Sequence, residues 1–351
     1  MSTLSIRDFE QVIYCNDSKT GLHAIIAIHS TALGPAVGGC RMWNYSTDSE
    51  ALTDALRLSK GMTYKASISG LNWGGGKSVI IGDPQKPKNP DLLKRFGDFV
   101  HRLGGHYITA KDVGINSADL KTIKSNTPWV LGIDGEKNSS GDPSPATAWG
   151  VYHGMKACAK HAFGSESLKG LKIAVQGLGA VSMSLVGHLA KEGAEIWGCD
   201  INTKQTDEAQ KKYGVKIVTP DEIYDVNCDV FSPGALGAII NPQTLPRIKA
   251  KVIAGAANNQ LSTDEMGFEV MKRGIIYAPD YAINAGGLTN IYHEMMVDGG
   301  YDKDRAFTHV SKIKDTIDTI LTRAKAEKLP TSMVADKMAE ERVARASFQA
   351  R

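Results

Sequence analysis

The second half of the chain alternates short apolar runs with helical patterns, and this alternation restricts the possible folds more than any other feature. Its first apolar run, 171–175 (LKIAV), leads into a glycine-containing turn and then into a helical pattern at 181–190. A second run at 194–199 is followed directly by Asp200. Four more short runs follow, at 215–218, 228–231, 251–254 and 275–277. Strands and helices in alternation are typical of a parallel, doubly wound sheet, which is the fold we expect here.

The turn after the first of these runs has small residues where a nucleotide-binding turn needs them. Gly177 permits the tight turn, Gly179 lets a pyrophosphate approach the backbone, and Ser182 is small enough for the helix to pack on the strand. Glycine or alanine is usual at that last position. The helix N-terminus would offer free N–H groups and a favourable dipole to the anion. The residues expected to contact the cofactor at this turn are Gly177, Leu178, Gly179, Ala180, Val181 and Ser182.

Asp200 indicates which dinucleotide this turn binds. It lies about 20 residues beyond the turn, at the end of the next strand, where a carboxylate binds the ribose hydroxyls. A carboxylate repels a 2′-phosphate, and the following Ile201 and Asn202 supply no arginine to receive one. The pattern therefore predicts NAD rather than NADP.

The first half contains a second glycine-rich segment, Gly74-Gly75-Gly76, which runs into Lys77 and an apolar stretch at 79–81. Three glycines predict a loop that is free to take positive φ and lets a ligand lie against the peptide groups. A lysine between such a loop and a buried strand is partly desolvated, so its pKa should fall toward neutrality. A lysine of that kind can transfer protons.

The rest of the first half reads as mixed α/β. We expect strands at 22–28 and 106–109, and helices at 49–60 and 89–103. The stretch 34–39 (GPAVGG) is rich in turn residues. The strand at 106–109 would place Asp112 just beyond its carboxyl end, the position at which ligands bind in α/β sheets.

Length and composition bound the domain organisation. A chain of 351 residues is too long for one ordinary core, and the polar, Gly/Pro/Ser-rich stretch 132–145 resembles a linker. We predict a domain of residues 1–144, completed by a C-terminal helix at about 330–351, and a second domain of residues 145–329. Further helices are expected at 147–162, 288–296, 305–326 and 334–346.

Charge and cysteine usage exclude several classes of function. A net charge of +3 is too balanced for a nucleic-acid or membrane surface. The five cysteines are scattered and never form a CxxC pair, which argues for a cytoplasmic protein without disulfides or a metal site. Neither a signal peptide nor a membrane-spanning stretch is evident.

Several segments resemble the amino-acid dehydrogenase superfamily, which comprises glutamate, leucine, phenylalanine and valine dehydrogenases. The most specific is 71–84 (LNWGGGKSVIIGDP), which matches that superfamily's active-site pattern throughout. Leucine dehydrogenases and their branched-chain relatives are the most similar. The segments that carry this likeness are 34–43 (GPAVGGCRMW), 55–65 (ALRLSKGMTYK), 139–157 (SSGDPSPATAWGVYHGMKA) and 278–287 (APDYAINAGG).

This resemblance implies an activity and an architecture. The reaction would be reversible oxidative deamination, in which an L-amino acid, NAD⁺ and water become a 2-oxo acid, ammonium and NADH. The fold would be an N-terminal mixed α/β domain for substrate binding and self-association, from dimer to octamer, separated by a cleft from a Rossmann-type domain that binds NAD.

The resemblance also implies roles for individual residues. Lys65 would bind the substrate carboxylate, Lys77 would activate water, and Asp112 would exchange protons with the amine. Gly38 and Gly39 would bring backbone against the substrate, and Asn284 would lie near the reacting centre. The remaining cofactor contacts would be Thr147, Ala235 and Asn259.

The implied side-chain pocket consists of Val37, Ala110, Leu288 and Ile291. All four are apolar, so burying an acidic substrate side chain would cost several kcal/mol, which disfavours glutamate. Branched-chain substrates fit best, with phenylalanine or tryptophan as the alternative. The stretch 234–238 (GALGA) departs from the family because it lacks a cysteine that relatives commonly carry there. A catalytically silent NAD-binding regulator on the same scaffold is a more distant alternative.

Overall fold

The structure, a computed structural model, describes residues 5–295 and 300–349. Residue 296 of the helix expected at 288–296 and residues 350–351 lie outside these ranges. The chain divides into two compact units. The first unit comprises the described residues of 5–142, 291–301 and 339–349, and the second comprises 143–290 and 302–338. The division falls within two helices, α9 (Gly286–Met295) and α12 (Thr331–Gln349).

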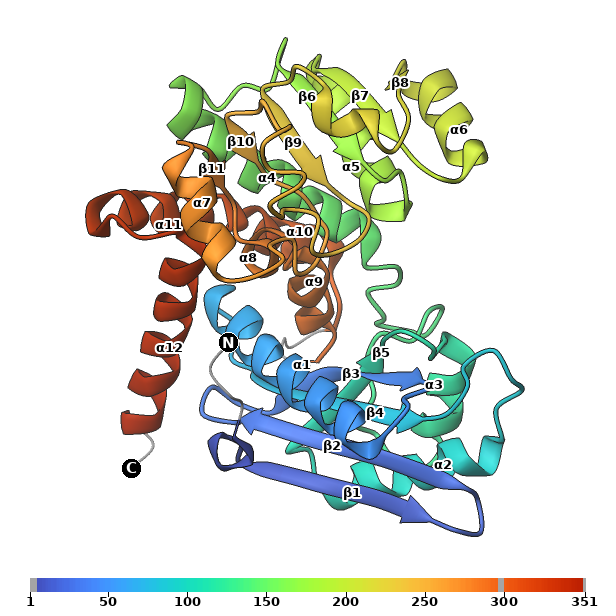
Figure 1. Cartoon of the computed structure of the whole chain (residues 1–351). Helices are drawn as coiled ribbons and strands as arrows, with labels where there is room; N and C mark the ends of the chain where they lie inside the picture. The colour runs from blue at the N-terminus through green and yellow to red at the C-terminus, as the bar shows by residue number, and fades with distance from the viewer. Residues whose placement is uncertain (1–4, 296–299, 350–351) are drawn as a thin grey trace. The chain divides into compact units, whose positions relative to one another are not determined.

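The sheet of the first unit has the strand order β1-β2-β4-β3-β5 (Figure 1). β1 pairs with β2 and β2 with β4 in antiparallel fashion, whereas β3 is parallel to both β4 and β5. The strands are β1 (Gln11–Asp17), β2 (Leu22–Ser30), β3 (Ala36–Trp43), β4 (Gly74–Ile81) and β5 (Tyr107–Lys111). A short 3₁₀ helix, η1 (Ile6–Asp8), precedes β1.

Helices cover both faces of this sheet because its strands are apolar on both sides. Alternate residues of β2 enter different cores: Ile25 and Ala27 pack in one cluster, and Ile26 and Ile28 in another. The first cluster includes residues of α1 (Asp48–Ile68), and the second includes residues of α2 (Pro90–Arg102) and α3 (Ser117–Lys124).

The first unit also contains the end of the C-terminal helix. Arg342 of α12 donates hydrogen bonds to Ser67 O (3.1 Å), Leu71 O (2.8 Å) and Asn72 Oδ1 (3.1 Å). Ser67 Oγ in turn donates to Ala339 O at 2.8 Å. The helix therefore satisfies carbonyl groups at the end of α1 and in the loop that leads into β4.

The second unit has a parallel sheet in the order β11-β10-β9-β6-β7-β8 (Figure 1). Numbered along the chain from β6, this is the doubly wound order 3-2-1-4-5-6 of dinucleotide-binding folds. The strands are β6 (Lys172–Gln176), β7 (Glu195–Cys199), β8 (Lys216–Ile217), β9 (Val230–Pro233), β10 (Val252–Ile253) and β11 (Ile276–Tyr277). The expected fold class is confirmed.

Helices follow the strands of this sheet as expected from the sequence. They are α4 (Ser144–Phe163), α5 (Ala180–Glu192), α6 (Thr203–Tyr213), η2 (Glu222–Asp225), α7 (Glu265–Lys272), α8 (Asp280–Ile283), α10 (Lys303–Ser311) and α11 (Ile313–Glu327). The single helix expected at 305–326 is wrong. Lys312 lies between α10 and α11, so this range contains two helices.

Two further expectations about glycine are also wrong. Gly74, Gly75 and Gly76 lie in β4 rather than in a loop, and none of them has positive φ. Likewise the turn-rich stretch 34–39 enters β3 at Ala36. In both places glycine serves close packing of the backbone, which a local turn signal does not reveal.

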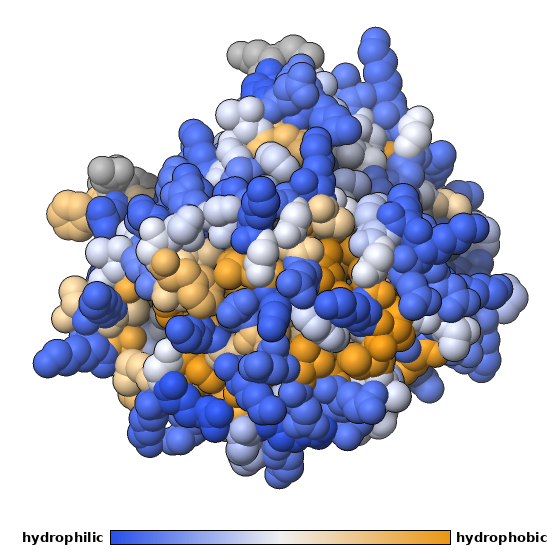
Figure 2. All heavy atoms as spheres, turned by 90° about the horizontal axis from the view of Figure 1, so that it is seen from above, coloured by the Kyte–Doolittle hydropathy of each residue, from blue (hydrophilic) through white to orange (hydrophobic). Residues whose placement is uncertain are grey.

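On the face shown in Figure 2, apolar surface is interrupted throughout by hydrophilic side chains. Among the described residues, every helix is too short or too polar to cross a membrane.

Candidate active site

Three parallel strands of the first unit form a platform on which glycine is required. A Cβ on Gly38 of β3 would lie 1.7 Å from the carbonyl oxygen of Gly76, and one on Gly75 of β4 would lie 2.1 Å from the backbone nitrogen of Thr63 in α1. A Cβ on Gly39 would lie 2.8 Å from the Cβ of Asp112. The glycines therefore let β3, β4 and α1 approach closely and leave room beside Asp112.

This platform brings Lys77 and Asp112 together. Lys77 extends from β4 and Asp112 follows β5, and Lys77 Nζ lies 3.0 Å from Asp112 Oδ1. The Lys77 side chain is only 5% exposed, and that of Asp112 is 23% exposed. Behind them, the buried Tyr107 hydroxyl donates to Gly38 O at 2.6 Å and lies 2.9 Å from Ser78 Oγ. The pair therefore sits on a rigid, largely dry surface.

Burial and charge set the protonation of this pair. Burial lowers the pKa of Lys77 below its ordinary value, although the Asp112 carboxylate opposes the shift. This is the direction predicted from the sequence. Burial alone would raise the pKa of Asp112, but Lys77 and Arg41 outweigh it and hold that pKa below the ordinary value. Asp112 is thus an anion, beside an amine that loses its proton more readily than an exposed lysine.

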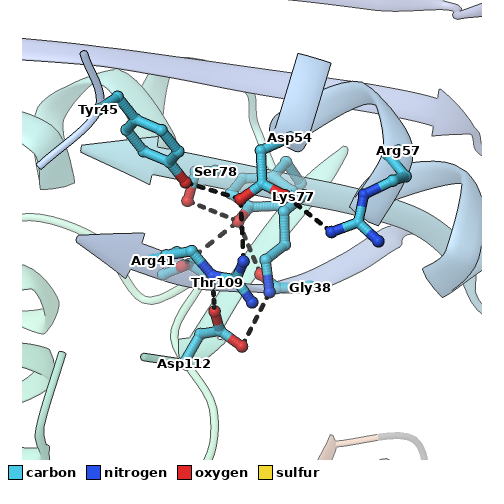
Figure 3. Close-up of polar contacts among 10 residues, drawn as sticks. Gly38, Arg41, Tyr45, Asp54, Arg57, Lys77, Ser78, Thr109 and Asp112 are labelled. Carbon is cyan, nitrogen blue, oxygen red and sulfur yellow. Dashed lines mark hydrogen bonds and ion pairs between the residues drawn. The ribbon is translucent and has the colours of Figure 1, made fainter. Parts of the chain in front are cut away.

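Arg41 of β3 links Asp112 to a second carboxylate, that of Asp54 (Figure 3). Its Nε lies 2.8 Å from Asp112 Oδ2, and its Nη1 lies 2.9 Å from Asp54 Oδ2. Asp54, on α1, also accepts a hydrogen bond from the Tyr45 hydroxyl (2.7 Å) and pairs with Arg57 Nη2 (3.0 Å). Five charged side chains therefore alternate in sign from Lys77 to Arg57.

The other residues expected at the substrate end of the first unit lie on its strands and helices. Val37 and Ala110 are buried, and the pairing of β3 with β5 sets Gly39 opposite Ala110. Lys65 is half-buried on α1, two residues beyond Thr63. Ile291 of α9 is half-buried, and its Cδ1 lies 3.7 Å from where a Cβ on Gly132 would be.

Glu294, one turn beyond Ile291, fastens this end of α9. Its carboxylate accepts hydrogen bonds from the backbone N–H groups of Gly132 (3.1 Å) and Ser140 (2.7 Å), and from Ser140 Oγ. The loop 132–140 is therefore held against the helix that carries Ile291.

In the second unit, the predicted nucleotide turn has the expected shape. Gly177 has φ +84°, and a Cβ there would lie 2.7 Å from the Cβ of Ala235. Gly179 has open space where its Cβ would be and caps α5 without a side-chain hydrogen bond. The first N–H groups of α5 therefore have no side-chain cap at Gly179.

Asp200 lies at the end of β7, beside this turn. Its Oδ2 accepts a hydrogen bond from the backbone N–H of Leu178 at 2.7 Å, and its Oδ1 accepts from Asn202 N–H at 2.8 Å. The carboxylate is thus held next to the glycine turn, as the spacing predicts.

The remaining predicted residues of the second unit form another group. Asn284 is buried and its Nδ2 donates to Ala256 O (3.0 Å) and Asn258 Oδ1 (2.8 Å), which places it beside the loop that contains Asn259. A Cβ on Gly287 would lie 2.8 Å from Thr147 Oγ1, so the start of α9, with Leu288, meets the start of α4.

Comparisons with known proteins agree with this geometry. A family model described as "Glu/Leu/Phe/Val dehydrogenase, dimerisation domain" matches residues 9–129, and one described as "Glutamate/Leucine/Phenylalanine/Valine dehydrogenase" matches residues 199–351. Leucine dehydrogenase of Geobacillus stearothermophilus is 53% identical over 336 residues, which cover 96% of this chain and 91% of that protein. The chain belongs to the Glu/Leu/Phe/Val dehydrogenase family.

This amino acid dehydrogenase is also similar to relatives that are named for other amino acids. Valine dehydrogenase of Streptomyces virginiae is 44% identical over 337 residues, covering 95% of this chain and 93% of that protein. The crystal structure of L-tryptophan dehydrogenase from Nostoc punctiforme superposes with a TM-score of 0.86 at 42% identity and covers 97% of both chains. The recognition of the superfamily is confirmed, and leucine dehydrogenase is among the relatives that share about half of their residues with this chain.

Sequence reasoning missed the outer half of this dehydrogenase's charged network. Arg41 and Asp54 were available in the sequence, the former as a charged residue in the otherwise apolar run 36–43 (AVGGCRMW). An arginine between buried strand residues needs a partner, and that is the signal that could have identified it. Its partner Asp112 is 71 residues away, so spacing along the chain gives no hint of the contact.

Proposed function

We propose that this dehydrogenase catalyses NAD-dependent, reversible oxidative deamination of branched-chain L-amino acids. The observation that carries the proposal is the Lys77–Asp112 pair, a buried amine 3.0 Å from a carboxylate on a platform of glycine backbone. An anionic carboxylate next to an amine of lowered pKa can exchange protons with an amino acid and activate water.

The reaction divides among residues of the first unit. Lys65 binds the substrate carboxylate, because a zwitterion needs a fixed cation there. Asp112 accepts a proton from the substrate ammonium group, and loss of the Cα hydride to NAD⁺, when it is bound, would leave an iminium carbon. Lys77, in its neutral form, accepts a proton from the water that attacks this carbon, and stabilises the developing oxygen. Lys77 then returns that proton to the amine and takes up the hydroxyl proton as the C–N bond breaks. The departing ammonia becomes ammonium with the proton held by Asp112.

We assign NAD to the turn of the second unit. Gly177 and Gly179 leave the helix N-terminus of α5 open to a pyrophosphate, and Asp200 is held beside them for the ribose hydroxyls. When bound, the nicotinamide supplies the hydride acceptor. Thr147, Asn259 and Ala235 complete the cofactor contacts, and Asn284 with the loop at 256–258 orients the reacting end.

The residues proposed to contact the substrate side chain are all apolar. Val37 on β3 and Ala110 on β5 are buried, and Leu288 and Ile291 are half-buried on one helix. An acidic substrate side chain among such residues would be unpaired at a cost of several kcal/mol. Discrimination among aliphatic side chains is about 1–3 kcal/mol per methylene, so we expect leucine, valine and isoleucine all to react.

Two properties of the whole protein complete the proposal. Self-association fits the dimerisation domain for which the matching family model is named. A cytoplasmic location fits the five cysteines, all of which are free and buried in the described part of the chain.

A substrate panel tests the proposal. Reduced cofactor is followed by absorbance with L-leucine, L-valine, L-isoleucine, L-phenylalanine and L-tryptophan, each with NAD⁺ and with NADP⁺. We expect turnover with the aliphatic substrates and NAD⁺. Faster turnover of an aromatic substrate would refute the proposed specificity, and NADH binding without any turnover would favour a silent regulator.

Lys77→Ala is the decisive variant, with an expected loss of about 10²–10⁴-fold in kcat. Lys88→Ala is its matched control, because Lys88 also forms a largely buried ion pair, with Asp119 (2.7 Å), in the same unit. Turnover by Lys77→Ala at the rate of Lys88→Ala would remove Lys77 from its role.

A further inference from the structure

We propose that Arg41 is a positioning residue for the reaction, holding the outer oxygen of Asp112 so that the inner oxygen stays directed at Lys77. This inference rests on the proposed function. Arg41 is half-buried on β3 and acts through Asp112, without contacting substrate itself.

The two oxygens of Asp112 have separate cationic partners. Oδ1 faces Lys77 Nζ at 3.0 Å, and Oδ2 faces Arg41 Nε at 2.8 Å (Figure 3). A carboxylate held at only one oxygen can rotate about its last bond. Held at both, it presents one defined lone pair to the amine and to an incoming proton.

The position requires an arginine rather than a lysine. Arg41 contacts two carboxylates at once, Asp112 through Nε and Asp54 through Nη1. The planar guanidinium offers these donors in a fixed fork, whereas the single ammonium of lysine cannot reach both acceptors in that geometry. Arg41 is therefore a rigid bridge between the sheet and α1.

Asp54 is in turn held from two sides. The Tyr45 hydroxyl donates to its Oδ2 at 2.7 Å, and Arg57 Nη2 lies 3.0 Å from its Oδ1. Its side chain is 16% exposed. With Asp54 fixed, the guanidinium of Arg41 cannot swing away from Asp112. In this way α1 supports the geometry of the residue that follows β5.

The charge of Arg41 also shifts the pKa values of both candidate catalytic groups in the same direction. It lowers the pKa of Asp112 and lowers the pKa of Lys77. The Cys40 thiol and the Tyr107 hydroxyl, both buried and neutral, also face the pair, and Asp54 lies beyond Arg41. Removing the guanidinium charge should therefore move both pKa values upward together.

The experiment compares Arg41→Ala and Arg41→Lys with Arg95→Ala. Arg95 is a matched control, because it also lies between two carboxylates of the first unit, Asp17 (3.4 Å) and Asp98 (3.3 Å). Rates with L-leucine and NAD⁺ are measured from pH 6 to 11. For Arg41→Ala we expect about 10²-fold lower kcat with a nearly unchanged KM, and a pH–rate profile shifted to higher pH. Arg41→Lys should keep the profile but still lose kcat.

Guanidinium chloride provides an independent readout. Arg41, Tyr45, Asp54 and Arg57 line a surface pocket of about 620 Å³, so a free guanidinium ion can reach the space that Arg41→Ala opens. We expect millimolar guanidinium to restore part of the kcat of Arg41→Ala and to leave Arg95→Ala unchanged. If Arg41→Ala does not fold, Asp54→Asn tests the same bridge, and its kcat should fall while KM is retained.

The possible failures are distinguishable. A wild-type chain without turnover refutes the proposed function and, with it, this role of Arg41. An active wild type whose Arg41→Ala variant behaves like Arg95→Ala refutes only the inference about Arg41. So does a loss of kcat with an unshifted pH profile and no rescue by guanidinium, because that is the behaviour of a merely structural residue.

Discussion

One prediction concerns two positions at which the sequence departs from the pattern that the family resemblance implies, Ser182 and Gly234. Serine stands where a nucleotide turn usually has glycine or alanine, and Gly234 begins the stretch in which the resemblance implies a cysteine. The structure sets these two positions against each other, since a Cβ on Gly234 would lie 2.1 Å from Ser182 Oγ. We infer that they compensate, the added hydroxyl on one side occupying space that a missing side chain leaves on the other.

The cost of Gly234→Ala follows from this contact. Gly234 does not have positive φ, so alanine brings no backbone strain and the cost is steric. Ser182 is 2% exposed at the start of α5, so its hydroxyl cannot relieve the contact by turning into solvent. Overpacking of this kind costs about 1–3 kcal/mol. Once the hydroxyl is removed, the nearest atom is Gln176 O at 3.1 Å, a tight contact that a small shift relieves.

A double-mutant cycle measures the compensation. Gly234→Ala should lower the free energy of unfolding by about 1–3 kcal/mol, and Ser182→Ala in the same chain should restore most of it. In a unit of this size, that corresponds to about 2–4 °C in Tm per kcal/mol by scanning calorimetry. Gly61→Ala on α1, where a Cβ would meet nothing within 4 Å, is the control and should not destabilise. Additive effects of the two substitutions, or a Gly234→Ala variant as stable as the wild type, would refute the reasoning.

Two further predictions concern stability. Arg342→Ala removes three hydrogen bonds from a charged group to oxygens in and after α1, so the free energy of unfolding in urea should fall by about 2–3 kcal/mol. The Arg345 side chain on the same helix is 77% exposed, so Arg345→Ala should change the free energy of unfolding little. Burial lowers the pKa of His29 to about 4. Between about pH 6.5 and 4, the His29 imidazole is therefore protonated in the unfolded chain but neutral in the folded chain. The free energy of unfolding should decline as the pH falls through this window. His29→Gln should have a smaller decline, and an equal slope in both proteins would contradict the assignment.

The second unit was the easier to predict because its signals are local. A buried parallel strand, a glycine turn and a helix follow one another within about 20 residues, and the next strand ends on the acidic residue that the turn requires. Gly177 and Asp200 were therefore placed correctly beside each other from spacing alone, and the Leu178–Asp200 hydrogen bond of 2.7 Å is the outcome.

Glycine in the first unit was misread because its cause is not local. The run at 74–76 has the composition of a loop, yet it is a strand packed so closely that a Cβ on Gly75 would lie 2.1 Å from a backbone atom of α1. In a turn, glycine is required by its own positive φ. In a closely packed strand, glycine is required by a neighbouring atom from a distant part of the chain. A single sequence shows the local turn signal but does not show which distant residue packs against a strand glycine.

The same reasoning explains why the inner pair was predicted and the outer bridge was not. Lys77 and Asp112 stand beside recognisable segments, so a motif locates each of them independently. The role of Arg41 depends on its contacts with Asp112, which follows β5, and with Asp54 on α1. Both contacts exist only once the sheet has formed. A charged residue inside an apolar strand should therefore be taken, in a sequence of this kind, as half of an ion pair whose other half lies next to the reacting groups. In this chain that reading selects Arg41 from the run 36–43 and leads from it to the carboxylate on which the proposed chemistry depends.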